Sequence, residues 1–210
     1  MPQIEKQGNS QNQNTSLNRI PVRKSELDRF KFGKKKLLEV ASLKKDGLPF
    51  CLDIACGAKP FPEANVLCDL HAEPVPDRSM KKLVTEGKPF VLCSCYSLPF
   101  KDKAFDFVTS YYLIEHVTEP WILFKEIKRI SKHGYVQCPT WFNELLYGED
   151  VHYWTVQKRD NKLCVKPLNG AIPPFRFGFI FHRLYKHSSW QILHAILDEK
   201  LHLFTVKYDF

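Results

Sequence analysis

Short apolar runs alternate with polar and amphipathic stretches through the middle of the chain. Five of these runs have the length of buried strands: 50–54, 65–70, 89–93, 105–109 and 135–138. Residues 120–131 carry apolar side chains at helical spacing, with Pro120 suited to the first turn and Gly134 to the C-terminal stop. Short apolar strands separated by helices predict an α/β fold, with a doubly wound, mostly parallel sheet and helices on both faces.

The two ends of the chain have different patterns. Residues 153–165 predict two strands around a turn at 159–162, followed by a helix over 188–199 and a strand over 202–208. We therefore expect a C-terminal β-hairpin and an antiparallel strand. Residues 1–24 are polar and aperiodic and predict a disordered tail. Residues 25–210 predict one domain, made of an N-terminal helix (25–45, capped by Ser25), a core (49–139) and a C-terminal part (140–210).

Charge and cysteine content limit the functional classes. The net charge is +8, but residues 1–48 hold 11 basic and 5 acidic residues, so most of the excess lies at one end. A nucleic-acid partner is therefore an alternative confined to that end. The seven cysteines form no C-x-x-C pair, and neither a secretory signal nor a long apolar span is evident. We expect a reducing, cytoplasmic setting, no membrane span and no metal site, and the oligomeric state is not predicted.

Acidic and small residues follow the first two predicted strands. The first strand runs into L-D-I-A-C-G-A (residues 52–58), and the second ends at Asp69 and Leu70. In a doubly wound sheet the carboxyl ends of the strands form the ligand-binding edge, where an acidic side chain can accept the hydroxyls of a ribose. Farther along come L-P-F-K-D-K-A-F-D-F-V (98–108) and E-H (115–116). This ordered series is more specific than any of its parts.

Residues 50–139 resemble a class I S-adenosylmethionine-dependent methyltransferase, in the branch with D-x-G-C-G, L-P-F-x-D-x-x-F-D-x-V and E-H motifs. The resemblance implies a Rossmann-like fold and S-adenosyl-L-methionine as cofactor. It implies that Asp69 holds the ribose, that Leu70 packs on the adenine and that Tyr111 lies beneath the methionine portion. The other cofactor-binding residues that it implies are the first turn (Asp53, Ala55, Cys56 and Gly57) and the adenine edge (Ser94 and Cys95).

The sequence departs from the family pattern in three places. Ala55 replaces the first glycine of the turn, and Ser94 stands where an aspartate is usual. Only seven residues, 58–64, separate the turn from the second strand, so the helix that usually follows must be missing or reduced to one turn. The first two departures leave open a methyltransferase-like binding module without activity.

Candidate catalytic residues follow the fourth and fifth strands. His116 or His152 could act as general base toward an acceptor, and Tyr112 is a further candidate near His116. A structural role is as good an interpretation for His116 and a slightly better one for His152. The Asn/Asp-Pro-Pro-Tyr/Phe step of many nitrogen-methylating enzymes is absent, and Ser110 to Tyr112 occupy that point. We expect methyl transfer to an oxygen of a small molecule or glycan. The alternative is an RNA or protein acceptor docked by the basic N-terminal segment.

Aromatic residues gather after the fifth strand. They could wall an acceptor pocket or pack a core equally well: Trp141, Phe142, Tyr147, Tyr153 and Trp154. A nicotinamide dehydrogenase is the weakest alternative, because the turn after the first strand lacks the later glycines and the helix of G-x-G-x-x-G.

Overall fold

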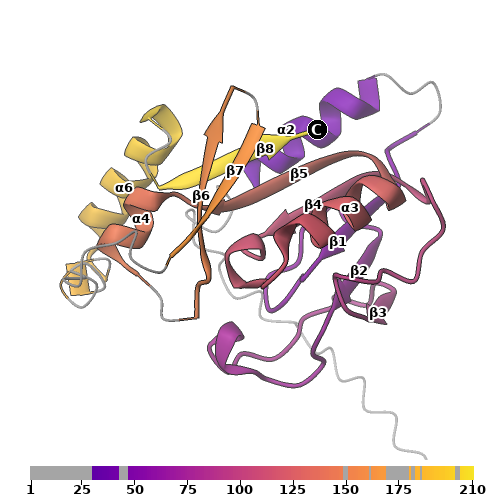
Figure 1. Ribbon diagram of the computed structural model, residues 1–210, viewed down its shortest axis with the longest axis horizontal. Helices are drawn as coiled ribbons and strands as arrows, with labels where there is room; N and C mark the ends of the chain where they lie inside the picture. The colour runs from indigo at the N-terminus through magenta and orange to yellow at the C-terminus, as the bar shows by residue number, and fades with distance from the viewer. Residues whose placement is uncertain are drawn as a thin grey trace, which may run out of the picture.

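The computed structural model describes residues 30–42, 47–148, 151–160, 162–168, 180, 183–184, 186–201 and 204–210. Its centre is a six-stranded sheet in the order β3-β2-β1-β4-β5-β8, with a separate hairpin of β6 and β7 (Figure 1). The expected tail over 1–24 and the predicted cap Ser25 lie outside the described residues. Within the described part of the chain, no helix is long and apolar enough to cross a membrane.

The strands of the large sheet are mostly parallel. Their bounds are β1 Cys51–Ile54, β2 Val66–Asp69, β3 Phe90–Leu92, β4 Phe105–Tyr111, β5 Ser131–Pro139 and β8 Thr205–Asp209. β1 pairs in parallel with β2 and β4, β2 with β3, and β4 with β5, whereas β8 runs antiparallel to β5. The strand order reverses between β1 and β4, which is the switch point where such sheets bind ligands. The predicted fold class is confirmed.

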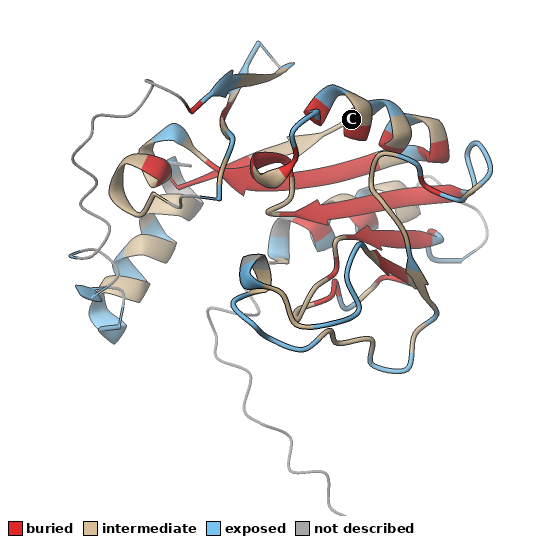
Figure 2. Ribbon diagram, turned by 60° about the horizontal axis from the view of Figure 1, so that its bottom comes forward, coloured by how far each residue is buried: buried red, intermediate tan, exposed pale blue. Residues whose placement is uncertain are grey.

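Two helices cover opposite faces of this sheet, whose strands are largely buried (Figures 1 and 2). α3 (Pro120–Ile130) buries Leu123, Ile127 and Ile130 in one core cluster. α2 (Lys31–Ser42) packs Leu37 into a second cluster on the other face. Gly33 of α2 allows close contact there, because a Cβ at that position would overlap the hydroxyl of Tyr111. A side chain at this point would hold the helix away from the sheet.

The connection between β1 and β2 contains no helix, as its length predicted. Residues 58–64 form only turns and bends. Phe61 fills the space instead: it is completely buried, and its ring meets that of Phe30 edge-on at 5.7 Å between centroids. A single phenylalanine in a loop thus covers sheet surface that a helix would otherwise cover.

The prediction that Gly134 ends the helix was wrong. α3 ends at Ile130, and Ser131 adopts an extended conformation that begins β5 at once. Gly134 lies inside β5, and its backbone exchanges two 3.2 Å hydrogen bonds with Phe210 beyond β8. The glycine serves close packing rather than helix termination, because a Cβ on it would overlap the Phe210 ring.

The described C-terminal residues contain the predicted elements and a short helix that was missed. β6 (Trp154–Arg159), β7 (Lys162–Pro167) and α6 (Ser188–Leu201) match their predicted ranges. The missed element is α4 (Trp141–Leu146), which the Thr140 side chain caps by accepting from the amide of Asn143 at 3.1 Å. A helix of six residues is too short to show periodicity in a sequence.

Candidate functional site

A cavity of about 520 Å³ lies at the carboxyl ends of β1, β2, β3 and β4. This volume falls in the range of small-molecule sites. The wall contains eight of the nine predicted cofactor-binding residues: Ala55, Cys56, Gly57, Asp69, Leu70, Ser94, Cys95 and Tyr111. The structure therefore brings together residues from four separate stretches of sequence.

The turn after β1 is fastened to the end of β2. Ala55 and Gly57 both adopt left-handed backbone conformations, each with φ of 57°. The amide of Cys56 donates to the carbonyl of Cys68 at 3.1 Å, and the amide of Gly57 donates to Asp69 Oδ2 at 2.9 Å. Because alanine tolerates this conformation less well than glycine, Ala55 holds strain at the wall of the cavity.

Asp69 is the acidic group of the cavity wall. Its Oδ1 accepts from the amide of His71 at 3.1 Å, and its Oδ2 lies 3.4 Å from Nη1 of Arg78. A carboxylate offers about four acceptor positions, so the hydrogen bonds from Gly57 and His71 leave room for ligand hydroxyls. The geometry fits a group that presents a pair of hydroxyls to this edge.

Asp53 is the one predicted cofactor-binding residue that does not line the cavity. Its side chain is 2% exposed. Oδ2 accepts from the amide of Phe61 at 2.8 Å, and Oδ1 accepts from the hydroxyl of Thr109 at 2.8 Å. The carboxylate therefore ties β1 to β4 and to the loop that replaces the helix.

Arg78 is a cavity residue that the sequence did not reveal. It ends the short helix η1 (Pro76–Arg78), and its guanidinium donates to the carbonyls of His71, Glu73 and Lys81. These bonds hold the loop between β2 and β3 beside the turn at Gly57. No motif marks this arginine, because its role follows from the path of a loop.

Three thiols lie along the β1 and β3 sides of the cavity. Burial raises the pKa of Cys56 to about 12 and that of Cys95 to about 11, so both are protonated at neutral pH. Cys93 differs, because a hydrogen bond from the thiol of Cys68 lowers its pKa. The hydroxyl of Ser94 accepts from the amide of Tyr96 at 3.2 Å.

Two of the three predicted catalytic residues line the opposite end of the cavity. Tyr112 follows β4 in a left-handed conformation with φ of 58°, and its hydroxyl accepts from Nε2 of Gln137 at 3.0 Å. His116 ends the short helix η2 (Ile114–His116) and also lies on the wall. Tyr153 joins them from the segment before β6. We refer to this group, Tyr112, His116 and Tyr153, as the acceptor end.

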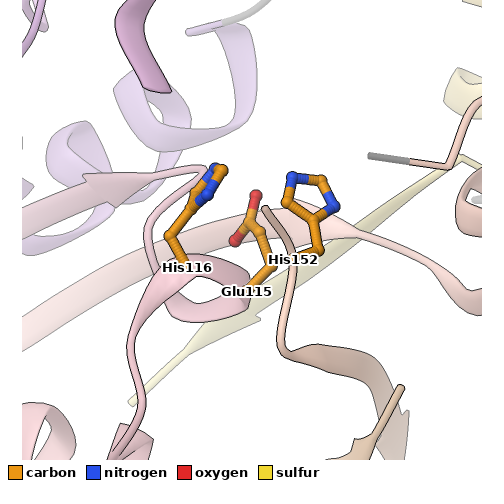
Figure 3. Close-up of side chains that lie close together, drawn as sticks. All are labelled: Glu115, His116 and His152. Carbon is orange, nitrogen blue, oxygen red and sulfur yellow. The ribbon is translucent and has the colours of Figure 1, made fainter. Parts of the chain in front are cut away.

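His152, the third predicted catalytic residue, lies directly behind His116. Their rings meet edge-on with centroids 4.5 Å apart. Nδ1 of His152 lies 2.7 Å from Oε1 of Glu144, which is buried on α4. Figure 3 shows the carboxylate of Glu115 between the two imidazole rings.

Other parts of the sequence motifs have structural tasks. Arg129 of α3 donates to the carbonyls of Leu98 and Phe100 and to the carboxylates of Asp102 and Glu126, which fixes the L-P-F-K-D loop. Asp106 accepts from the amide of Phe50 and from Lys132. These side chains position the loop beside the cavity and do not line it.

Only one member of the aromatic cluster reaches the cavity, and that is Tyr153. The Trp154 indole donates to the carbonyl of Val117 at 2.7 Å, and Phe142 packs on Phe204. Tyr147 accepts from the indole of Trp190 at 3.0 Å. The cluster is mainly a packing element that attaches the C-terminal part to the core.

A family model describing a methyltransferase domain matches residues 52–136. An uncharacterized methyltransferase of Schizosaccharomyces pombe is 30% identical over 105 residues, which is 41% of this chain and 38% of that protein. The chain thus spans less than half the length of this curated relative.

Solved structures give weaker overlaps. A protein of Pyrococcus horikoshii is 17% identical, with a TM-score of 0.43 and coverage of 85% of this chain and 89% of that one. An S-adenosylmethionine-dependent methyltransferase of Mesorhizobium loti is 12% identical, with a TM-score of 0.43 and coverage of 82% and 95%. Phosphoethanolamine N-methyltransferase 2 of Haemonchus contortus, solved with S-adenosyl-L-methionine, is 16% identical, with a TM-score of 0.36 and coverage of 50% and 28%.

These structural overlaps are too low to carry an argument, and the assignment rests on the family match and its agreement with the motifs. The match runs from β1 into β5 and so includes β1 to β4, the strands whose ends form the cavity. S-adenosyl-L-methionine is the cofactor of this family. The match to a methyltransferase-domain family over residues 52–136, together with the motifs, therefore supports a class I S-adenosylmethionine-dependent methyltransferase.

Proposed function

We propose that this protein transfers a methyl group from S-adenosyl-L-methionine to an oxygen of a small molecule or glycan. The observation that carries the proposal is the single cavity wall that joins the cofactor-type turn at Gly57 and Asp69 to a histidine at the other end. When bound, the cofactor supplies a methyl group already activated on a sulfonium. The chain must bind it, orient an acceptor and accommodate the acceptor's proton.

The residues of the cavity fit this cofactor. The carboxylate of Asp69 can accept ribose hydroxyls, and Leu70 offers apolar surface to a purine ring. Gly57 has no side chain to obstruct the approach of a ligand to the turn. We propose that Ala55, Cys56 and Gly57 lie along the amino-acid and ribose portions, that Ser94 and Cys95 lie at the adenine edge, and that Tyr111 lies at the methionine portion.

The acceptor end suits a hydroxyl-bearing acceptor. Tyr112 and Tyr153 are aromatic surfaces of the kind on which sugars stack. His116 lies on the cavity wall, and the ring of His152 contacts the ring of His116. Methyl transfer to a hydroxyl would release the hydroxyl's proton, so the chain would need a group near the acceptor oxygen that takes it. An imidazole is suited to accept such a proton at neutral pH.

The proposal is tested by cofactor binding first and by turnover second. Calorimetric titration of the protein with S-adenosyl-L-methionine should show one site, and Asp69→Asn should weaken it at least about tenfold because charge-assisted hydrogen bonds to the ribose are lost. Absence of binding to the unsubstituted protein contradicts the methyltransferase proposal itself.

Turnover is measured as S-adenosylhomocysteine formed with a panel of hydroxylated acceptors, mono- and oligosaccharides among them. His116→Gln and His152→Gln should lower turnover by about 10²–10⁴-fold while cofactor binding is retained. His133→Gln, in β5 and away from the cavity wall, is the matched control and should leave turnover unchanged. Full turnover in both His116→Gln and His152→Gln would show that neither histidine acts in methyl transfer.

A further inference from the structure

Two buried carboxylates and two imidazoles meet beside the acceptor end. Glu115 is 1% exposed and Glu144 is 2% exposed. Potential ligand atoms of Glu115, His116 and His152 all lie within 4.8 Å of one another. The sequence led us to expect no metal site, because its cysteines lack metal-ligand spacing.

We propose that Glu115, His116 and His152 bind a divalent transition-metal cation, of which Zn²⁺ is the representative, and that Glu144 orients His152 for this task. The proposal rests on the proposed function and changes one part of it: the two histidines bind a metal that holds the acceptor oxygen, instead of taking its proton directly. Two imidazoles and one carboxylate are a common ligand set for Zn²⁺ sites that keep a coordination position open.

The separation of the ligand atoms is close to what a metal requires. Bonds of about 2.0–2.1 Å in tetrahedral geometry place neighbouring ligand atoms about 3.4 Å apart. The observed limit of 4.8 Å therefore needs each side chain to move inward by less than about 1 Å. Side-chain torsions can supply this shift without backbone movement.

Two hydrogen bonds attach the segment that carries His152 to the segment that carries Glu115 and His116. The amide of Tyr153 donates to the carbonyl of Glu115 at 2.7 Å, and the indole of Trp154 donates to the carbonyl of Val117 at 2.7 Å. These two bonds fix the segment of His152 alongside η2. These contacts hold the side chains of the cluster close together within the described structure.

Glu144 gives His152 the orientation that a metal ligand needs. Its contact with Nδ1 leaves Nε2 on the side of Glu115, where Figure 3 shows a ring nitrogen. In zinc sites the ligating histidine commonly donates a hydrogen bond from its other ring nitrogen to a carboxylate. Glu144 Oε2 is itself buried, with no hydrogen-bond partner among the described residues.

Electrostatics also favour a cation at this point. After burial itself, the carboxylates of Glu115 and Glu144 are the causes that raise the pKa of the Cys138 thiol well above its usual range. Both negative charges therefore act on one buried region. A dication bound here would be attracted to both carboxylates.

The position relative to the cavity gives the metal its task. His116 lies on the cavity wall, and His152 lies behind it. An open coordination position beside His116 would face the acceptor end and bind an acceptor oxygen. The chemistry recognised is an alcohol or vicinal diol, with the metal lowering the pKa of the bound hydroxyl.

The test measures metal binding without turnover. The protein is freed of metal with a chelator, then titrated with Zn²⁺ by calorimetry and assayed for metal per chain by mass spectrometry. We expect one equivalent, with affinity lowered at least about 100-fold in His152→Gln and about 10–100-fold in Glu144→Gln. His133→Gln should bind like the unsubstituted protein, and Mg²⁺ should bind far more weakly because imidazole ligands do not suit it.

Two results overturn the proposal: no Zn²⁺ equivalent on the unsubstituted protein, or equal affinity in His152→Gln. Because these use the unsubstituted chain as well as variants, misfolding of a variant does not obscure the answer. Binding of S-adenosyl-L-methionine to metal-free protein is measured in parallel. Cofactor binding without Zn²⁺ binding refutes the metal alone, whereas absence of cofactor binding refutes the proposed function.

Discussion

Asp53 and Asp69 end neighbouring strands, yet the structure gives them different tasks. Asp53 is buried and joins β1 to Phe61 and Thr109, whereas Asp69 lines the cavity. We predict that Asp53→Ala lowers stability and that Asp69→Asn lowers cofactor affinity. Asp53→Ala should leave the cofactor affinity of the folded protein largely unchanged, and Asp69→Asn should leave the stability largely unchanged. The affinity of the Asp53 variant is measured under conditions in which it is folded.

The magnitude for Asp53→Ala follows from two hydrogen bonds of 2.8 Å to a charged acceptor. Such bonds contribute about 1.5–3 kcal/mol each, and the substitution also leaves the buried amide of Phe61 without its acceptor. The expected loss is about 3–5 kcal/mol in the free energy of unfolding, or about 6–20 °C in Tm for a domain of this size. This is a large share of the usual 5–15 kcal/mol.

Asp53→Asn is the matched control. Its amide oxygen can accept from the amide of Phe61, and its amide NH₂ can donate to the hydroxyl of Thr109, which can turn to accept. We expect this variant to lose about 1 kcal/mol or less and to bind the cofactor within about threefold of the unsubstituted protein.

The assay combines urea unfolding with calorimetric titration of S-adenosyl-L-methionine. A folded Asp53→Asn protein that loses cofactor binding as severely as Asp69→Asn refutes the reasoning, since it would place Asp53 in contact with ligand. So would an Asp53→Ala protein with unchanged stability.

Three further predictions concern the cavity and its supporting loop. Cys93, whose pKa is lowered, should be alkylated fastest among the cavity thiols, and saturating S-adenosyl-L-methionine should slow its alkylation. The rate is measured by mass spectrometry of the peptide that contains Cys93. Equal rates with and without the cofactor contradict the placement of the cofactor beside this thiol. Ala55→Gly relieves a left-handed alanine and should raise the unfolding free energy by about 0.5–1 kcal/mol in urea titrations, with no loss of cofactor affinity. The hydrogen bond from Arg129 lowers the pKa of Glu126 in the folded protein. The ionised carboxylate therefore stabilises the fold at pH values above the pKa of Glu126 in the unfolded chain. This stabilisation is lost as the pH falls through the lower pKa of the folded protein. The stability difference between the unsubstituted protein and Glu126→Gln should therefore shrink between about pH 6 and about pH 3, and a constant difference contradicts this pairing.

The sheet was predictable because its strands are buried on both faces and appear as continuous apolar runs. The short crossover after Gly57 could be anticipated from seven residues that include two prolines. Gly134 misled because a glycine after an amphipathic stretch usually ends a helix, whereas here it accommodates the ring of Phe210. That contact joins residues far apart in sequence, and no local pattern records it.

The candidate site was predictable where a motif carries it and not where tertiary contacts create it. The turn at Gly57 and the acid Asp69 line one cavity, and their contact with the cofactor stays a prediction. Motif position alone could not separate Asp53 from Asp69, because both end a strand and only the loop at Phe61 decides which is covered. The meeting of His116 with His152 depends on backbone hydrogen bonds between η2 and the segment before β6.

The packing of α2 has a consequence for synthesis on the ribosome. α2 precedes every strand, yet its apolar side is covered by β4 and β5, which are made roughly 60–100 residues later. At about 5–20 residues per second, this helix waits for several seconds without the surface it packs on. Nascent chains that stop before β5 should therefore present part of the surface around Leu37 to chaperones.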